Sequence, residues 1–168
     1  MQNSTVRKMT LIALLAAVTY LATAFLRVPY AGNQGYLNFG DAIILFAACF
    51  IDPIAGGIVG VIGAGLADFT FGYIQFLPFT IVIKFVMGLV AGFFYRYGKG
   101  FFRYIGIVIS SLFMVIGYAF AYYLLYGGWG AVVAYSPFDI VQAVAAIIMS
   151  LILIFTAKKV RLMRESDN

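Results

Sequence analysis

Residues 52–71 read DPIAGGIVGVIGAGLADFTF and carry the clearest helix signals in the chain. Asp52 suits the cap of a helix, and Pro53 suits the first helical position, so we expect a helix to begin here. Residues 54–71 then carry a single charge, Asp68. A helix needs roughly 20 apolar residues to cross the hydrocarbon core of a bilayer. The stretch therefore predicts a membrane-spanning helix over about 54–71.

Small residues repeat along this helix at a spacing of four. They are Gly56, Gly60 and Ala64, and Asp68 continues the series. A second series follows in the next apolar stretch: Lys84, Gly88 and Gly92. Residues four apart share one helix face, and small side chains let two helix backbones approach closely. Both stripes are therefore expected to face other helices rather than lipid.

The whole chain shares this apolar character. Of its 168 residues, 64% are hydrophobic and only 10% are charged, and the mean hydropathy is +1.03. The predicted spans are about 9–28, 39–51, 54–71, 78–95, 102–126 and 137–158. We therefore expect an all-α integral membrane protein with six transmembrane helices, forming one domain over residues 1–168. A re-entrant hairpin made from the two short spans, 39–51 and 54–71, is the alternative.

The basic residues predict the topology. Most of them fall in three clusters: Arg7 and Lys8; Arg96, Lys99 and Arg103; Lys158, Lys159, Arg161 and Arg164. Because cytoplasmic segments retain Lys and Arg, both termini and the 96–103 loop are expected in the cytoplasm. The outer loops would be about 29–38, 72–77 and 127–136, and they contain no Lys or Arg.

Polar residues within the spans gather near the outer ends. Asp41, Asp68 and Asp139 are expected within one or two turns of the outer surface, and Lys84 about two turns below Pro78. A charge in a span costs a few kcal/mol, so it usually faces a partner or a water-filled cavity. Asn38 and Gln142 fall at a similar depth. Together these residues outline a polar pocket that opens outward.

Each of these residues also has a purely structural interpretation. Asp139 has capping-box spacing from Ser136 at the start of the sixth span, and Asp41 lies near the positive end of the second helix. Asp68 and Lys84 could form a structural ion pair that holds two helices in register. A tryptophan beside an outer loop could belong to an aromatic belt at the membrane interface.

Several functional classes are disfavoured. The chain has one cysteine, Cys49, and no histidine, which disfavours a disulfide framework, a metal site and an enzyme. It lacks a phosphate-binding loop, so ATP would have to be hydrolysed by partner subunits. The net charge of +5 reflects topology rather than nucleic-acid binding. A self-sufficient ion-coupled transporter, with Asp68 or Asp41 as proton carrier, remains open, although no convincing internal repeat is visible.

Three segments carry a family resemblance: LNFGDAIIL at 37–45, DPIAGG at 52–57 and GAGLAD at 63–68. The first span adds a small-residue motif, Ala13-x-x-x-Ala17, which favours close contact with another helix, inside or outside the chain. With six spans in under 200 residues, the chain resembles the substrate-binding S components of energy-coupling factor (ECF) vitamin transporters. The match is to their riboflavin- and hydroxymethylpyrimidine-type branch and covers essentially the whole chain.

The resemblance implies a transport subunit of the bacterial plasma membrane that needs no cofactor. It would capture a vitamin from outside and dock on a membrane T component and two ATP-hydrolysing subunits. Ala13 and Ala17 would contact the T component, and the 29–38 loop would be a lid. The expected substrate-binding residues are Asn38, Asp41, Asp68, Lys84, Trp129, Asp139 and Gln142.

The expected cargo is a small flat heterocycle. Carboxylates can accept hydrogen bonds from an exocyclic amine, and aromatic side chains can stack on a ring. The aromatic candidates are Tyr36, Phe76, Trp129 and Tyr135. Hydroxymethylpyrimidine, the thiamine precursor, fits best, pyridoxine fits almost as well, and riboflavin is large for such a pocket.

Overall fold

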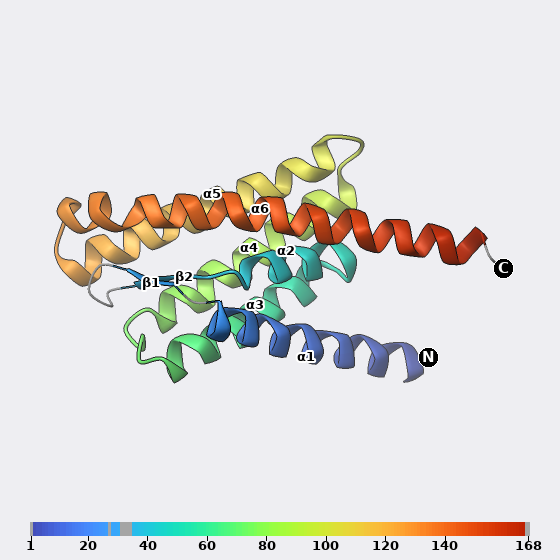
Figure 1. Cartoon of the computed structure of the whole chain (residues 1–168), viewed down its shortest axis with the longest axis horizontal. Coiled ribbons are helices and arrows are strands. Elements are labelled where there is room, and N and C mark those ends of the chain that lie inside the picture. The colour runs from blue at the N-terminus through green and yellow to red at the C-terminus, as the bar shows by residue number, and fades with distance from the viewer. Residues whose placement is uncertain (1, 27, 31–34, 167–168) are drawn as a thin grey trace.

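A computed structural model describes residues 2–26, 28–30 and 35–166, which form six helices and a short β-hairpin (Figure 1). The elements are α1 (Gln2–Phe25), β1 (Val28–Tyr30), β2 (Gly35–Leu37), α2 (Asp41–Phe50), α3 (Pro53–Thr70), α4 (Leu77–Tyr97), α5 (Phe102–Tyr126) and α6 (Trp129–Ser166). All but α2 contain a segment long and apolar enough to cross a membrane. The predicted six-helix membrane fold is confirmed.

The two ends of the molecule differ in what they contain. Both termini and the α4–α5 connection lie at one end, whereas the hairpin and the α5–α6 turn lie at the other (Figure 1). We call these the basic end and the hairpin end. Arg96 in the last turn of α4 and Arg103 in the first turn of α5 lie at the basic end. This grouping agrees with the charge pattern, and we propose below which side of the membrane each end faces.

The second predicted span is shorter than expected. The helix α2 contains only 10 residues, about 15 Å of helix, which is half of a hydrocarbon core of about 30 Å. The antiparallel pairing of β1 with β2, from Val28 opposite Leu37 to Tyr30 opposite Gly35, precedes it. Between the hairpin end and the start of α2, the chain therefore enters the helix bundle as non-helical backbone. Asp41, the first residue of α2, consequently lies deeper than the sequence suggested.

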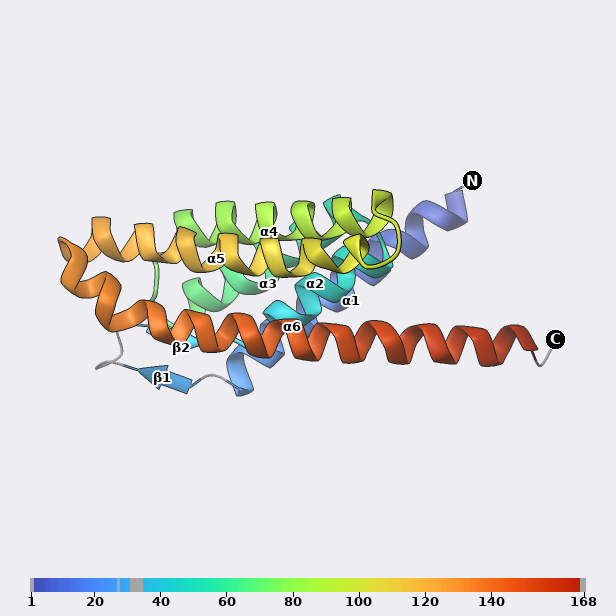
Figure 2. The ribbon, with the colours of Figure 1, turned by 90° about the horizontal axis from the view of Figure 1, so that it is seen from above.

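The start of the sixth helix also differs from the prediction. Gly127 ends α5 with a left-handed φ of 76°, and Gly128 follows with a φ of 135°. Such backbone favours glycine and turns the chain within two residues. Helix α6 then begins at Trp129 and contains Pro137 in its interior. The predicted outer loop over 127–136 is therefore wrong, and the first turns of α6 run at an angle to the rest of the helix (Figure 2).

The small-residue stripes pack as predicted. A methyl group built on Gly88 of α4 would lie 2.3 Å from the backbone nitrogen of Gly57 in α3. One built on Gly60 would lie 2.9 Å from Cβ of Lys84. The backbones of α3 and α4 are thus in direct contact, which only residues without a side chain allow. The seam brings the polar ends of both helices together at the hairpin end.

Candidate substrate-binding site

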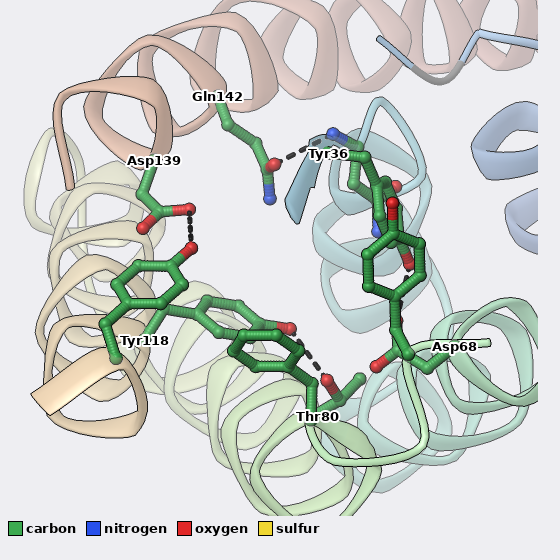
Figure 3. A pocket seen from close by; sticks show the side chains of 10 residues that line it. Tyr36, Asp68, Thr80, Tyr118, Asp139 and Gln142 are labelled. Atoms are coloured by element: carbon green, nitrogen blue, oxygen red, sulfur yellow. Dashed lines mark hydrogen bonds between the residues drawn. The ribbon is translucent and has the colours of Figure 1, made fainter. Parts of the chain in front are cut away.

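A polar pocket lies at the hairpin end, between β2 and helices α3 to α6 (Figure 3). Its lining residues are Tyr36, Asn38, Asp68, Tyr73, Phe76, Thr80, Tyr118, Tyr122, Asp139 and Gln142. The volume of the cavity is about 30 Å³, enough for about two water molecules. Half of these lining residues are aromatic and the other half are polar or charged, so flat apolar faces and hydrogen-bonding groups converge, as in sites for small organic ligands.

One wall is organised around Asp68, near the end of α3. Tyr36 from β2 donates a hydrogen bond of 2.6 Å to Oδ1 of Asp68, and this bond ties the hairpin to the helix. Burial raises the pKa of Tyr36 well above its ordinary value of 10.0, and the adjacent Asp68 carboxylate raises it further. The Tyr36 hydroxyl therefore stays protonated and remains a donor. The other oxygen of Asp68, Oδ2, is buried without a hydrogen-bond partner among the described residues.

The facing wall carries Asp139 from α6. Tyr122 of α5 donates to its Oδ1 at 3.2 Å, while its Oδ2 is buried and has no hydrogen-bond partner in the described part of the chain. Asp139 is 3% exposed. Because α6 begins ten residues earlier in the sequence, at Trp129, Asp139 does not close a helix start. The capping-box interpretation is therefore wrong, since this side chain points toward α5 and the pocket (Figure 3).

Gln142 connects the pocket to the layer beneath it. Its Oε1 accepts from the backbone nitrogen of Asn38 at 2.8 Å, and its Nε2 donates to Oδ2 of Asp41 at 2.7 Å. The side chain of Asn38 accepts in turn from Thr23 of α1 at 2.7 Å and from the backbone nitrogen of Gly40 at 2.6 Å. One amide side chain thus joins the base of β2 to α2 and α6.

An ion pair lies below the pocket. Lys84 Nζ lies 2.7 Å from Oδ1 and 2.9 Å from Oδ2 of Asp41, and both residues are fully buried. The same ammonium group lies 5.0 Å from the ring centre of Tyr118. The alternative in which Lys84 pairs with Asp68 is therefore wrong. Since α2 begins deep in the molecule, Asp41 reaches the level of Lys84, whereas Asp68 faces the hairpin.

The seven predicted binding residues thus fall into three groups. Asn38, Asp68, Asp139 and Gln142 line the pocket. Asp41 and Lys84 form the layer beneath and reach the pocket through Gln142. Trp129 is 73% exposed, packs edge-on against Tyr123 and does not line the pocket. Its position agrees with the alternative of an aromatic belt.

The aromatic predictions divide in the same way. Tyr36 and Phe76 line the pocket, while Tyr135 packs edge-on against Tyr122 behind it. Four lining residues were not predicted from the sequence: Tyr73, Thr80, Tyr118 and Tyr122. The spacing of four between the last two offered a signal, because it places two hydroxyls on one face of an apolar helix. Buried tyrosine hydroxyls need polar partners.

The motif in α1 presents two different faces. Ala13 and Ala17 are exposed, whereas Ala16 is buried, and Thr19 packs against Gly63 of α3. Contact of α1 with the rest of the chain therefore uses other residues than the Ala13-x-x-x-Ala17 pair. Residues 31–34 of the expected lid lie outside the described residues. Within the described part of the chain, no group of three His, Cys, Asp or Glu side chains could hold a metal ion.

Comparison with known proteins agrees with this architecture. A protein of Pyrococcus woesei, named "uncharacterized protein in gap 3′ region", is 42% identical over 134 residues, which cover 79% of this chain and 88% of the relative. The thiamine precursor transporter HmpT of Lactococcus lactis subsp. cremoris (strain MG1363) is 29% identical over 154 residues, 91% of this chain and 89% of HmpT.

A solved structure of the S component of a bacterial ECF transporter has the same fold. It superposes with a TM-score of 0.71 over 95% of this chain and 99% of that one, at 24% sequence identity. The model of the family "ECF-type riboflavin transporter, S component" matches residues 3–159. This chain therefore belongs to the family of ECF-type riboflavin transporter S components, which are multi-pass membrane transport subunits and not enzymes.

Proposed function

We propose that this chain captures a small heterocyclic vitamin precursor, with hydroxymethylpyrimidine ranked first, pyridoxine second and riboflavin third. The observation that carries the proposal is the small aromatic pocket with buried carboxylates at the hairpin end. Rings of Tyr73, Phe76 and Tyr122 offer flat faces for stacking on a heterocycle. The similarity to HmpT, a thiamine precursor transporter, supports placing a thiamine precursor first.

The size of the pocket favours a small cargo. Its free space holds about two water molecules, so even a single ring requires the lining residues to move apart. The tricyclic ring and ribityl chain of riboflavin would require a much larger displacement. Since Tyr36 of β2 lines the pocket and donates a hydrogen bond to Asp68 of α3, we propose that the hairpin acts as the lid and opens when this hydrogen bond breaks.

Delivery would depend on partner subunits. We propose that the hairpin end faces outward and that the basic end, with both termini, faces the cytoplasm, because Lys and Arg are retained on that side. The exposed Ala13 and Ala17 would contact a membrane T component. Two ATP-hydrolysing subunits would supply the energy, since the chain has no phosphate-binding loop of its own.

The first test is to titrate the purified chain in detergent with hydroxymethylpyrimidine, pyridoxine and riboflavin. Calorimetry is the suitable readout, because Trp129 points away from the pocket and would report binding poorly. We expect nanomolar binding of hydroxymethylpyrimidine by the chain alone. Binding of none of the three compounds would overturn the proposed cargo.

A second test separates an S component from an ion-coupled transporter. In liposomes, the chain alone should bind its cargo without accumulating it, and uptake should require the partner subunits and ATP. Accumulation by the chain alone under a proton gradient would instead favour the secondary transporter. The ion pair of Asp41 with Lys84 argues against Asp41 as a proton carrier, because the ammonium group of Lys84 already balances the charge of its carboxylate.

A further inference from the structure

The unused hydrogen-bonding capacity of the pocket is concentrated on two carboxylates. Asp68 and Asp139 are 4% and 3% exposed, and each has one bonded and one unbonded oxygen. An ionised carboxylate can accept about four hydrogen bonds. A buried acceptor without a hydrogen bond costs free energy. A ligand that donates to both unbonded oxygens would remove this cost, and its binding would be strengthened accordingly.

The neighbouring donors are already engaged. The hydroxyls of Tyr36 and Tyr122 donate to the bonded oxygens of the two carboxylates. The hydroxyl of Thr80 lies close to Asp68 and shares a hydrogen bond of 3.0 Å with Tyr118. Both ends of the Gln142 amide are also occupied. What the two carboxylates have left to offer a ligand is therefore acceptor capacity.

The charges lead to the same result. Lys84 is paired with Asp41 below the pocket, so it does not directly compensate Asp68 or Asp139. The only salt bridges among the described residues are this pair and that of Lys8 with Asp52 at the other end of the molecule. In their ionised form Asp68 and Asp139 can only accept hydrogen bonds, so they favour ligand N–H groups over ligand carbonyls.

We infer that Asp68 and Asp139 form a pair of opposed acceptors that selects a heterocycle bearing an exocyclic amine and a second donor on another edge. Their positions on facing walls would let them hold both donors while the aromatic side chains cover the ring faces (Figure 3). The pair would reject a ring whose edge carries carbonyl oxygens, as the flavin edge does. This inference rests on the proposed function and specifies how the site chooses among vitamins.

The test compares two pyrimidines that differ in one substituent. Hydroxymethylpyrimidine carries a 4-amino group, and its 4-oxo counterpart carries a carbonyl there. Both are titrated by calorimetry into the full chain and into Asp68→Asn and Asp139→Asn. Asp52→Asn is the matched control, because Asp52 lies between α2 and α3 at the basic end. The measured quantity is the ratio of the two dissociation constants within each protein.

We expect the unaltered chain and the control to prefer the amine by at least about tenfold, the range of a charge-assisted hydrogen bond. An asparagine at the position facing the 4-substituent can donate to the carbonyl. The preference should therefore fall by about tenfold or invert in one of the two pocket variants. Because the ratio is taken within one protein, a smaller folded fraction does not affect it.

Three outcomes would be adverse, and they are distinguishable. Equal binding of both pyrimidines by the unaltered chain would overturn the carboxylate inference and leave the capture function intact. So would an amine preference that persists in both Asp68→Asn and Asp139→Asn. Failure of the unaltered chain to bind either pyrimidine, with tight binding of riboflavin, would overturn the proposed cargo as well.

Discussion

The buried ion pair makes the most decisive prediction for stability. Replacing Lys84 with methionine keeps an unbranched apolar stem but removes the ammonium group that lies 2.7 Å from Oδ1 of Asp41. Asp41 would then remain fully buried with the Gln142 amide as its remaining side-chain donor. Removing one member of a buried pair typically costs 3–5 kcal/mol, because the other charge stays behind. We expect Lys84→Met to lose about that much stability.

The expected loss can be measured as a melting temperature. For chains of 150–250 residues, 1 kcal/mol corresponds to roughly 2–4 °C, so the melting temperature should fall by roughly 6–20 °C. Cys49 is the single cysteine of the chain and is partly buried. A thiol-reactive fluorescent dye would therefore report unfolding in detergent. Lys99→Met is the matched control, because Lys99 is exposed on the α4–α5 connection.

A double variant separates the ion pair from the loss of packing. Asp41→Asn in the Lys84→Met background removes the stranded charge and still lets Gln142 donate to an oxygen. We expect this double variant to regain most of the lost stability, because neutral replacement of both partners is often tolerated. Two results would contradict this account of the ion pair. One is a melting temperature of Lys84→Met equal to that of the unaltered chain, and the other is a double variant no more stable than Lys84→Met.

Three further predictions concern the rest of the chain. Ala13→Trp should abolish uptake with partner subunits while cargo affinity stays unchanged, because this residue is exposed and far from the pocket lining; equal loss of both would contradict the division of roles. Gly88→Ala should lower stability by about 1–3 kcal/mol, since its methyl group would meet backbone atoms of α3, whereas Gly65→Ala makes an ordinary 3.5 Å contact and should be tolerated. Burial alone would raise the pKa of Asp52, but hydrogen bonds from Lys8 and the backbone outweigh it and hold the pKa below its usual value. The stabilising contribution of ionised Asp52 is thus present at neutral pH and lost below about pH 4. On acidification, the melting temperature of the unaltered chain should therefore fall more than that of Asp52→Asn.

Much of the fold could be predicted from the sequence because its signals are local. Hydropathy over about 20 residues identifies membrane-crossing segments, and the cap at Asp52 forms as expected, with its side chain accepting from the backbone nitrogen of Ala55. The small-residue stripes predicted the close contact between α3 and α4, because small side chains on one helix face let another helix backbone approach closely. The predicted span boundaries placed Asp68 and Asp139 near one end of the molecule.

The depth and the partners of individual side chains could not be predicted, because they depend on how the helices pack. Asp41 pairs with Lys84 because the chain reaches α2 as non-helical backbone, and hydropathy does not distinguish that path from a longer helix. Two glycines turn α5 into α6 earlier than Pro137 suggested, which leaves Trp129 exposed on the surface of the protein. Composition and periodicity are properties of one segment, whereas a hydrogen bond or an ion pair depends on where two segments begin and how they cross. For this reason most residues of the pocket could be predicted from the sequence, whereas the hydrogen bonds and ion pairs between them could not.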